Sequence, residues 1–185
     1  MAERLHIVTV SGPPGSGTST ACEQLSLRLG WHYVNAGQIF RQMAEENGVS
    51  LVDFGQRAEE DARIDRDLDA RMVQIARQRQ CVILEGRITG WMAAQNGLSA
   101  FKVWLQALPE VRAGRVGGRD HIEPEQAMRD MAQREKSETK RYLDHYGIDI
   151  GDLSVYDLVI DTEGLAPQAV VERIAAAVEA RGEGP

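Results

Sequence analysis

Short runs of apolar and β-branched residues alternate along this chain with longer segments in which apolar positions recur every three or four residues. The short runs predict five buried strands, at about 5–10, 32–34, 81–84, 101–105 and 158–160. The longer segments predict helices at about 19–29, 36–47, 61–79, 111–119 and 167–181, a helix that starts after Ser50 as its cap, and one long helix or a pair at 123–146. This alternation predicts an α/β fold whose five-stranded parallel sheet carries helices on both faces.

The turn after the first predicted strand is rich in glycine and leads directly into a helix. It reads GPPGSGTS and matches the phosphate-loop pattern G-x-x-x-x-G-K-[ST], except that Thr18 stands in the lysine position. Glycines let successive backbone N–H groups converge on phosphate oxygens, and the helix adds its positive N-terminal end. A glycine-rich turn with a purely structural role is the alternative. We expect the phosphates of a nucleotide to bind at Gly12, Pro13, Pro14, Gly15, Ser16, Gly17, Thr18, Ser19 and Thr20, with the Ser19 hydroxyl on Mg²⁺.

Composition and charge indicate a soluble globular protein and argue against a nucleic-acid-binding or membrane protein. The 185 residues suit one domain with a full core, and 43% apolar and 26% charged residues are typical of a soluble globular protein. A net charge of −7 argues against a nucleic-acid or membrane surface, and no apolar run has the length of a bilayer span. The two cysteines lie far apart without metal-type spacing, which indicates reduced thiols. We therefore expect a cytoplasmic monomer that binds small anionic ligands.

Several motifs after the loop carry a family resemblance. They read AGQIFRQMAEENGVSLVDFGQRAEED, IDRDLDAR, VILEGRITGWM and REKSETKRYLDHYGIDIGDLSVYDLVIDT. With the loop, they resemble the nucleoside monophosphate kinases, and more closely the archaeal type of cytidylate kinase, from about Ile7 to about Thr162. The phosphate loop of that group often reads glycine-threonine, so Thr18 agrees with it. The resemblance implies a P-loop fold and Mg²⁺-assisted transfer of the γ-phosphoryl group of ATP to CMP or dCMP. Another small kinase (adenylate or dephospho-coenzyme A kinase) and a nucleotide-binding module without turnover are the alternatives.

The same resemblance implies a body of three parts. The core comprises about 1–35, 80–114 and 136–185, the NMP-binding arm about 36–79, and the lid about 115–135. In such a body the core holds the sheet and the phosphate loop, and the arm and the lid are two segments that can close over the substrates.

Two arginines match family positions that hold the acceptor phosphate from opposite sides. Arg41 lies one helical turn after Gly37 in the arm, and Arg87 follows Gly86 after the third predicted strand. Arginine suits this role because its planar guanidinium stays protonated and grips phosphate through two N–H groups. Glu85 stands at the end of that strand, where a carboxylate can hold Mg²⁺-bound water, although an ion pair with a neighbouring arginine is the alternative.

A second group of arginines follows the fourth predicted strand, and its members are Arg115, Arg119, Arg134 and Arg141. Spacings of four and seven place each pair on one helix face, and the nearby Gly114, Gly117 and Gly118 predict a loose segment that suits a lid. A charged face in solvent is the alternative for each arginine. We expect at least two to reach phosphates, with Arg119 and Arg134 first. We hypothesise that they supply the positive charge that Thr18 lacks.

The arm also carries acidic residues that suit recognition of cytosine. The N4 amine of cytosine is a hydrogen-bond donor, which a carboxylate accepts. Asp61 and Asp65 are four residues apart and so can face the cleft together. Ion pairs within a charged helix face are the alternative for both.

Overall fold

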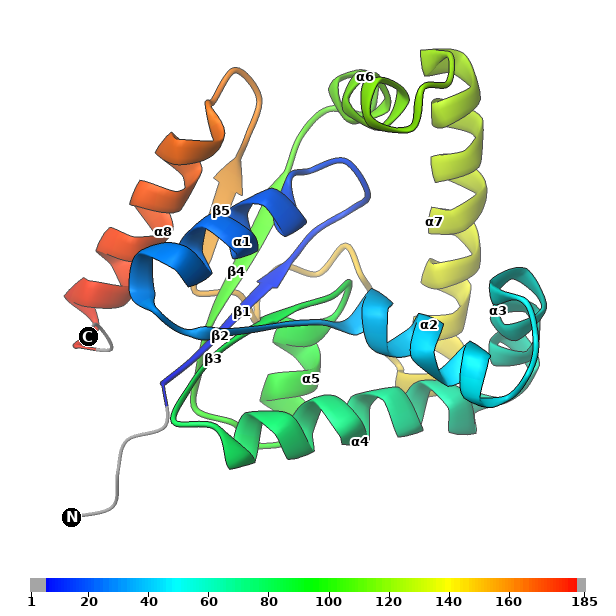
Figure 1. Cartoon of the computed structure of the whole chain (residues 1–185), viewed down its shortest axis with the longest axis horizontal. Coiled ribbons are helices and arrows are strands. Elements are labelled where there is room, and N and C mark those ends of the chain that lie inside the picture. The colour runs from blue at the N-terminus through cyan, green and yellow to red at the C-terminus, as the bar shows by residue number, and fades with distance from the viewer. Residues whose placement is uncertain (1–5, 183–185) are drawn as a thin grey trace.

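The computed structural model describes residues 6–182, at whose centre lies a parallel sheet of five strands (Figure 1). The strand order is β2-β3-β1-β4-β5, and all four neighbouring pairs are parallel. This confirms the predicted fold class; Leu5, which the pattern places in the first strand, lies outside the described residues. The strands are β1 (His6–Ser11), β2 (His32–Asn35), β3 (Cys81–Glu85), β4 (Ala100–Gln106) and β5 (Leu158–Asp161).

Eight helices in this part of the chain connect the strands or extend beyond them. They are α1 (Thr18–Leu29), α2 (Ala36–Glu46), α3 (Leu51–Glu60), α4 (Ala62–Gln78), α5 (Thr89–Gln95), α6 (Pro109–Asp120), α7 (Pro124–Tyr146) and α8 (Pro167–Ala180). The predicted helices are confirmed to within a few residues at their ends, and the segment predicted as one long helix or a pair forms the single helix α7. Helix α5 has no predicted counterpart, because seven residues are too few for a clear helical period.

Separate hydrophobic cores cover the two faces of the sheet. On one face, α1 and α8 pack over β-strand residues, and Val8, Val103 and Ile174 are fully buried there. On the other face, α4 and α5 pack over residues that include Val82 and Met72. Strands that are buried on both faces need apolar residues at consecutive positions, which explains the short continuous runs in the sequence.

Side-chain caps start the three helices between β2 and β3. Asn35, Ser50 and Asp61 each accept a hydrogen bond from a backbone N–H two or three residues further on. These bonds satisfy N–H groups that have no partner inside the helix, and they fix where each helix begins. The predicted cap at Ser50 is confirmed.

Helices α6 and α7 form a hairpin at the carboxyl end of the sheet, and α7 runs from α6 towards α4 (Figure 1). The three glycines that predicted a loose segment all lie inside α6. Gly117 is required there by close packing, since a Cβ atom would lie 2.8 Å from the carbonyl oxygen of Ile122. Within residues 6–182, no helix combines the length and the apolar character needed to cross a membrane.

Candidate active site

The phosphate loop between β1 and α1 has a backbone that requires glycine. Gly15 and Gly17 have φ angles of 80° and 94°, in the left-handed region that disfavours other residues. A Cβ atom at Gly12 would lie 2.4 Å from the carbonyl oxygen of Leu105, so the loop passes too close to β4 for a side chain. Because Gly17 caps α1, the first N–H groups of that helix open at the loop. The backbone chemistry of phosphate binding is thus present without lysine.

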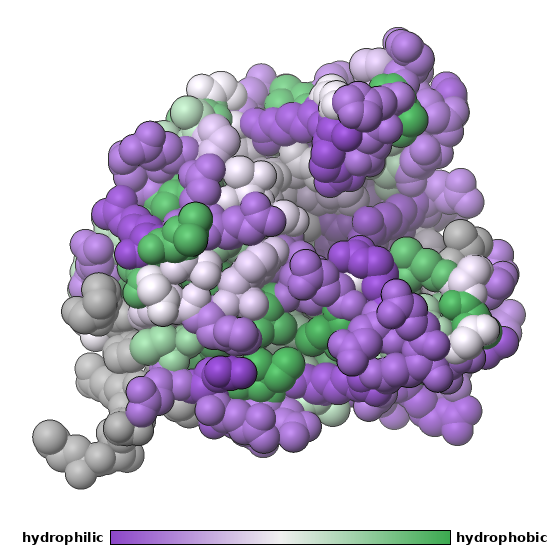
Figure 2. All heavy atoms as spheres, in the orientation of Figure 1, coloured by the Kyte–Doolittle hydropathy of each residue, from purple (hydrophilic) through white to green (hydrophobic). Residues whose placement is uncertain are grey.

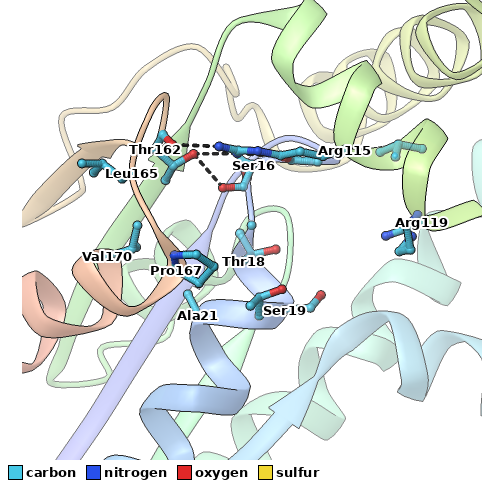
Figure 3. Close-up of a pocket in the computed structure, with 14 residues that line it drawn as sticks. Ser16, Thr18, Ser19, Ala21, Arg115, Arg119, Thr162, Leu165, Pro167 and Val170 are labelled. Atoms are coloured by element: carbon cyan, nitrogen blue, oxygen red, sulfur yellow. Dashed lines mark hydrogen bonds between the residues drawn. The ribbon is translucent and has the colours of Figure 1, made fainter. Parts of the chain in front are cut away.

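A cavity of about 410 Å³ lies beside this loop (Figure 3). Its polar side comprises residues 15–20 together with Arg115 and Arg119 of α6. Figure 2 shows the surface hollowed between α6 and α2, with hydrophilic residues in the hollow. One charged side and one apolar side suit a ligand that has a phosphate chain and a base. The apolar side comprises Val116, Leu165, Pro167 and Val170.

Glu85 lies at the foot of the phosphate loop. Its Oε1 accepts hydrogen bonds from Thr18 Oγ1 and Ser19 Oγ, both at 2.7 Å. Its Oε2 accepts from Tyr33 and Asn35, two residues of β2 that the sequence analysis missed. Burial and the bond to Glu85 raise the pKa of Tyr33, so this phenol stays a donor. The strand end therefore holds the Glu85 carboxylate beside the Ser19 hydroxyl, and these are the two residues for which a Mg²⁺ role is predicted.

Arg87 links the phosphate loop to α7. Its Nη1 donates to the carbonyl oxygen of Gly12 at 2.5 Å, and its Nε donates to Glu138 Oε2 at 2.6 Å. Arg134 Nε donates to the other oxygen of Glu138 at 2.8 Å. Burial favours the protonated form of Glu138, but Arg87 and Arg134 outweigh it and lower the pKa of this carboxyl group. Two predicted phosphate-binding arginines thus share one buried carboxylate.

Arg115 and Arg119 both face the cavity from α6, as their spacing predicted (Figure 3). Arg115 is held firmly, because it donates to the carbonyl oxygen of Gly15 at 3.2 Å and to both oxygens of Thr162 at 2.8–2.9 Å. Arg119 is exposed and pairs with the adjacent Asp120 at 2.6 Å. Arg119 is therefore the more available of the two for a ligand.

Helix α2, in the segment predicted to be the NMP-binding arm, carries Gly37 and Arg41. Arg41 is exposed, and its Nη1 lies 3.8 Å from the point where a Cβ atom of Gly37 would stand. Gly86 lies against this helix start, since a Cβ atom there would be 2.9 Å from the Cβ of Ala36. The ends of β2 and β3 thus bring Gly37, Arg41, Gly86 and Arg87 to the same edge of the sheet.

The two aspartates that were predicted to face cytosine have different surroundings. Asp61 caps α4 and pairs with Arg63, which lowers the pKa of Asp61 to about 2. Asp65 is buried against α7, 2.9 Å from Arg141 Nε and 3.1 Å from His145 Nδ1. Burial outweighs these partners and raises the pKa of Asp65. In this structure, Asp65 and Arg141 join α4 to α7.

The structure therefore assembles one site from segments far apart in the sequence. The loop, Glu85, Arg87 and the α6 arginines meet at the carboxyl edge of the sheet, whereas the pair of Asp65 and Arg141 lies where α4 meets α7. Sequence reasoning missed the partners that hold these groups, because a buried glutamate or tyrosine carries no local signal. These missed residues are Tyr33, Asn35, Arg112, Glu135, Glu138 and Thr162.

Solved structures with the same fold include several small kinases. A shikimate kinase from Bacteroides thetaiotaomicron has a TM-score of 0.62 and 15% identity, with 95% of this chain and 98% of that chain covered. An uncharacterized protein from Eubacterium ventriosum has a TM-score of 0.70 and 14% identity, with 95% and 99% covered. At such low identity these similarities establish the P-loop kinase fold alone.

Proteins that are similar in sequence establish the family as well as the fold. The chain is 47% identical over 173 residues to a cytidylate kinase of Pyrococcus abyssi, covering 94% of this chain and 93% of that protein. It is 42% identical over 183 residues to a cytidylate kinase of Halobacterium salinarum, covering 97% and 94%. Residues 7–164 match the cytidylate kinase-like family. This chain, with its phosphate loop and clustered arginines, therefore belongs to the cytidylate kinase-like family.

Proposed function

We propose that this protein is a nucleoside monophosphate kinase that transfers the γ-phosphoryl group of ATP to CMP, and also to dCMP. The observation that carries this proposal is the cavity between a glycine-rich phosphate loop and the arginines of α6, in a chain that is 47% identical to a cytidylate kinase. The buried Oγ of Ser16, which has no hydrogen-bond partner among residues 6–182, supports a polar ligand at the loop.

The donor nucleotide occupies this cavity, with its phosphates on the loop residues 12–20. Phosphoryl transfer requires positioning and compensation of negative charge more than covalent chemistry by the protein. Thr18 supplies no charge, and its hydroxyl is bonded to Glu85. Arg119 at the cavity and Arg134 beside Glu138 supply the positive charge in its place.

The donor set at the foot of the loop fits Mg²⁺. Ser19 and Glu85 present oxygen atoms 2.7 Å apart, and oxygen is the ligand that Mg²⁺ prefers. These two residues would hold the ion together with phosphate oxygens and water, because Mg²⁺ usually keeps several waters and binds through few protein ligands. When bound, the ion offsets the negative charge of the phosphates.

The acceptor CMP binds on the opposite side of the loop. Arg41 and Arg87 hold its phosphate, with Gly37 and Gly86 beside them, and Asp61, Asp65 and Arg141 contact the nucleoside. In this role the guanidinium of Arg87 releases the carbonyl oxygen of Gly12 and binds the phosphate instead. A hydrogen bond to the charged phosphate is stronger than one to a neutral carbonyl. The arm at 36–79 and the lid at 115–135 close over both substrates and exclude water.

A panel of acceptors tests this function directly. CMP, dCMP, UMP and AMP are each incubated with ATP and Mg²⁺, and ADP release and the phosphorylated product are measured. We expect CMP and dCMP to be the best acceptors. Faster phosphorylation of AMP or UMP would refute the assignment, and tight ATP binding without turnover on any acceptor would favour a nucleotide-binding module.

Variants of the arginines test the replacement of the lysine. We expect Arg119→Ala and Arg134→Ala to lower kcat by about 100-fold, as loss of a transition-state contact does. Arg129→Ala, at an exposed position of α7, is the matched control. We expect Thr18→Lys to restore part of the activity of either alanine variant. Near-normal kcat in both alanine variants would contradict the hypothesis.

The protein acts as a monomer in the cytoplasm. Its net charge of −7 supports a freely diffusing protein without a general affinity for nucleic acid. Light scattering coupled to size-exclusion chromatography tests the oligomeric state, and a mass near 20.5 kDa is expected.

A further inference from the structure

Carbonyl oxygens of the phosphate loop accept hydrogen bonds from arginines of other elements. The three pairs are Arg87 with Gly12 at 2.5 Å, Arg112 with Pro14 at 3.0 Å and Arg115 with Gly15 at 3.2 Å. Two of these arginines have expected ligand roles. Arg112 has none, because it lies buried on α6 and is absent from the lining of the cavity.

Arg112 is bound to several groups at once. Its Nη1 donates to Glu135 Oε1 of α7 at 2.5 Å as well as to Pro14, and its Nε donates to the carbonyl oxygen of Ala107 at 3.1 Å. The backbone of Arg112 also packs under the loop, since a Cβ atom at Gly15 would lie 2.7 Å from its carbonyl oxygen. The guanidinium is therefore held in one place between the loop and α7.

The bond to Pro14 controls a group that faces the ligand side. The carbonyl of Pro14 and the N–H of Gly15 belong to one planar peptide unit, so fixing the oxygen also fixes the direction of the N–H. Gly15 lines the cavity, and its φ of 80° is a backbone conformation that few residues other than glycine adopt. A cation on the carbonyl further polarises this peptide and strengthens its N–H as a donor.

Helix α7 holds the loop through two such connections. Glu135 and Glu138 are three residues apart, on neighbouring positions of the helix surface, and they bind Arg112 and Arg87 respectively. In Figure 1, α7 begins next to α6 and continues past the arm helices. The orientation of the loop and the placement of the arginines near it thus depend on the same helix.

We propose that Arg112 and Glu135 form a positioning pair that orients the Gly15 peptide for ATP and couples the phosphate loop to α7. The inference rests on the proposed function for its consequences in catalysis, but its effect on ATP binding is independent of the acceptor. Neither residue touches a substrate. A lysine at position 112 keeps the charge, but it lacks the planar fork that reaches Pro14, Ala107 and Glu135 together.

Calorimetric titration with ATP and Mg²⁺, without any acceptor, tests the pair in Arg112→Lys, Glu135→Gln and the double variant. We expect the Kd for ATP to rise about tenfold in Arg112→Lys and about threefold in Glu135→Gln, the range for a lost charge-assisted hydrogen bond that acts indirectly. Because the two residues act together, the double variant should bind no more weakly than Arg112→Lys. The KM for ATP should follow the Kd, and the KM for CMP should stay within about twofold.

Glu125→Gln, an exposed position in the first turn of α7, is the matched control and should leave ATP affinity unchanged. Circular dichroism establishes that each variant is folded. Glu135 is 34% exposed, so Glu135→Gln alone decides the question if Arg112→Lys does not fold. A lower melting temperature with unchanged Kd, or additive effects in the double variant, would overturn the proposal. Failure of CMP phosphorylation in the unmodified protein would refute the proposed function and leave this binding result intact.

Discussion

Asp69 of α4 carries a carboxyl group whose pKa is raised to about 6, and this should make the stability of the protein depend on pH. Burial is the main cause, and the nearby Asp65 adds to it. The hydroxyl of Tyr146 donates to Asp69 Oδ2 at 2.5 Å, and Arg141 lies close enough to favour the charged form, but together they do not offset the burial. The perturbation we suggest is Asp69→Asn, which keeps an oxygen acceptor for Tyr146 and removes the charge.

The expected magnitude follows from the difference in pKa between the folded and unfolded chains. With the ordinary value of 3.8 in the unfolded chain and about 6 in the folded one, the native state binds more protons between these pH values. The free energy of unfolding therefore falls as pH rises through this window. A shift of about two units corresponds to about 3 kcal/mol, at 1.36 kcal/mol per unit. About a third of this amount is already lost at pH 4.5, which lies above the ordinary value of 3.8. Between pH 4.5 and 7.5, Asp69→Asn should therefore gain about 2 kcal/mol relative to the unmodified protein.

Urea denaturation followed by circular dichroism measures this gain at four or five pH values for both proteins. The matched control is Asp67→Asn on the same helix. The side chain of Asp67 is 55% exposed, so this substitution should change the free energy of unfolding by less than about 1 kcal/mol. If the difference between Asp69→Asn and the unmodified protein is constant across this range, the reasoning about Asp69 is refuted.

Three further perturbations test other parts of the structure. Ile174→Ala removes a fully buried side chain between α8 and the sheet, and should lower the free energy of unfolding by about 2–5 kcal/mol. Urea denaturation measures this loss, and a value below about 1 kcal/mol would contradict the packing of this core. Gly15→Ala places a Cβ atom 2.7 Å from the carbonyl oxygen of Arg112, at a residue whose φ is 80°. Calorimetry should therefore detect at least a tenfold loss of ATP affinity, and unchanged affinity would count against this loop geometry. Glu85→Gln should lower kcat by about tenfold or more and raise the Mg²⁺ concentration needed for half-maximal turnover, and an unaltered Mg²⁺ dependence would exclude the metal role of Glu85.

Much of the fold was predictable because its signals are local. A strand that is buried on both faces reads as a continuous apolar run, and a helix that covers it repeats its apolar residues every three or four positions. The phosphate loop was equally accessible, since its glycines and the cap at Gly17 act through backbone geometry within eight residues. Helix α5 was missed because seven residues after Gly86-Arg87 offer neither a capping side chain nor a clear period.

The candidate site was predictable only in its residue types. Each arginine on a helix has the same local signature whether it faces solvent, a carboxylate or a ligand. The structure distinguishes the two helical arginines Arg119 and Arg141, because Arg119 stays exposed at the cavity and Arg141 pairs with Asp65 of α4. It also shows that Arg87, in the turn after β3, is buried against the loop. Such differences depend on which elements pack together, and sequence spacing along one helix does not contain that information.

The sequence by itself determined the α/β fold and the phosphate loop with Thr18 in place of lysine, since periodicity and glycine geometry act over a few residues. Only the tertiary structure decided what surrounds the loop. Thr18 and Ser19 meet Glu85 across 67 and 66 positions of the chain, and Arg112 reaches Pro14 across 98. These contacts depend on the parallel strand order, which brings the carboxyl ends of β1, β3 and β4 to one edge. Buried charges then find partners there because an unpaired charge removed from water is too unfavourable to persist.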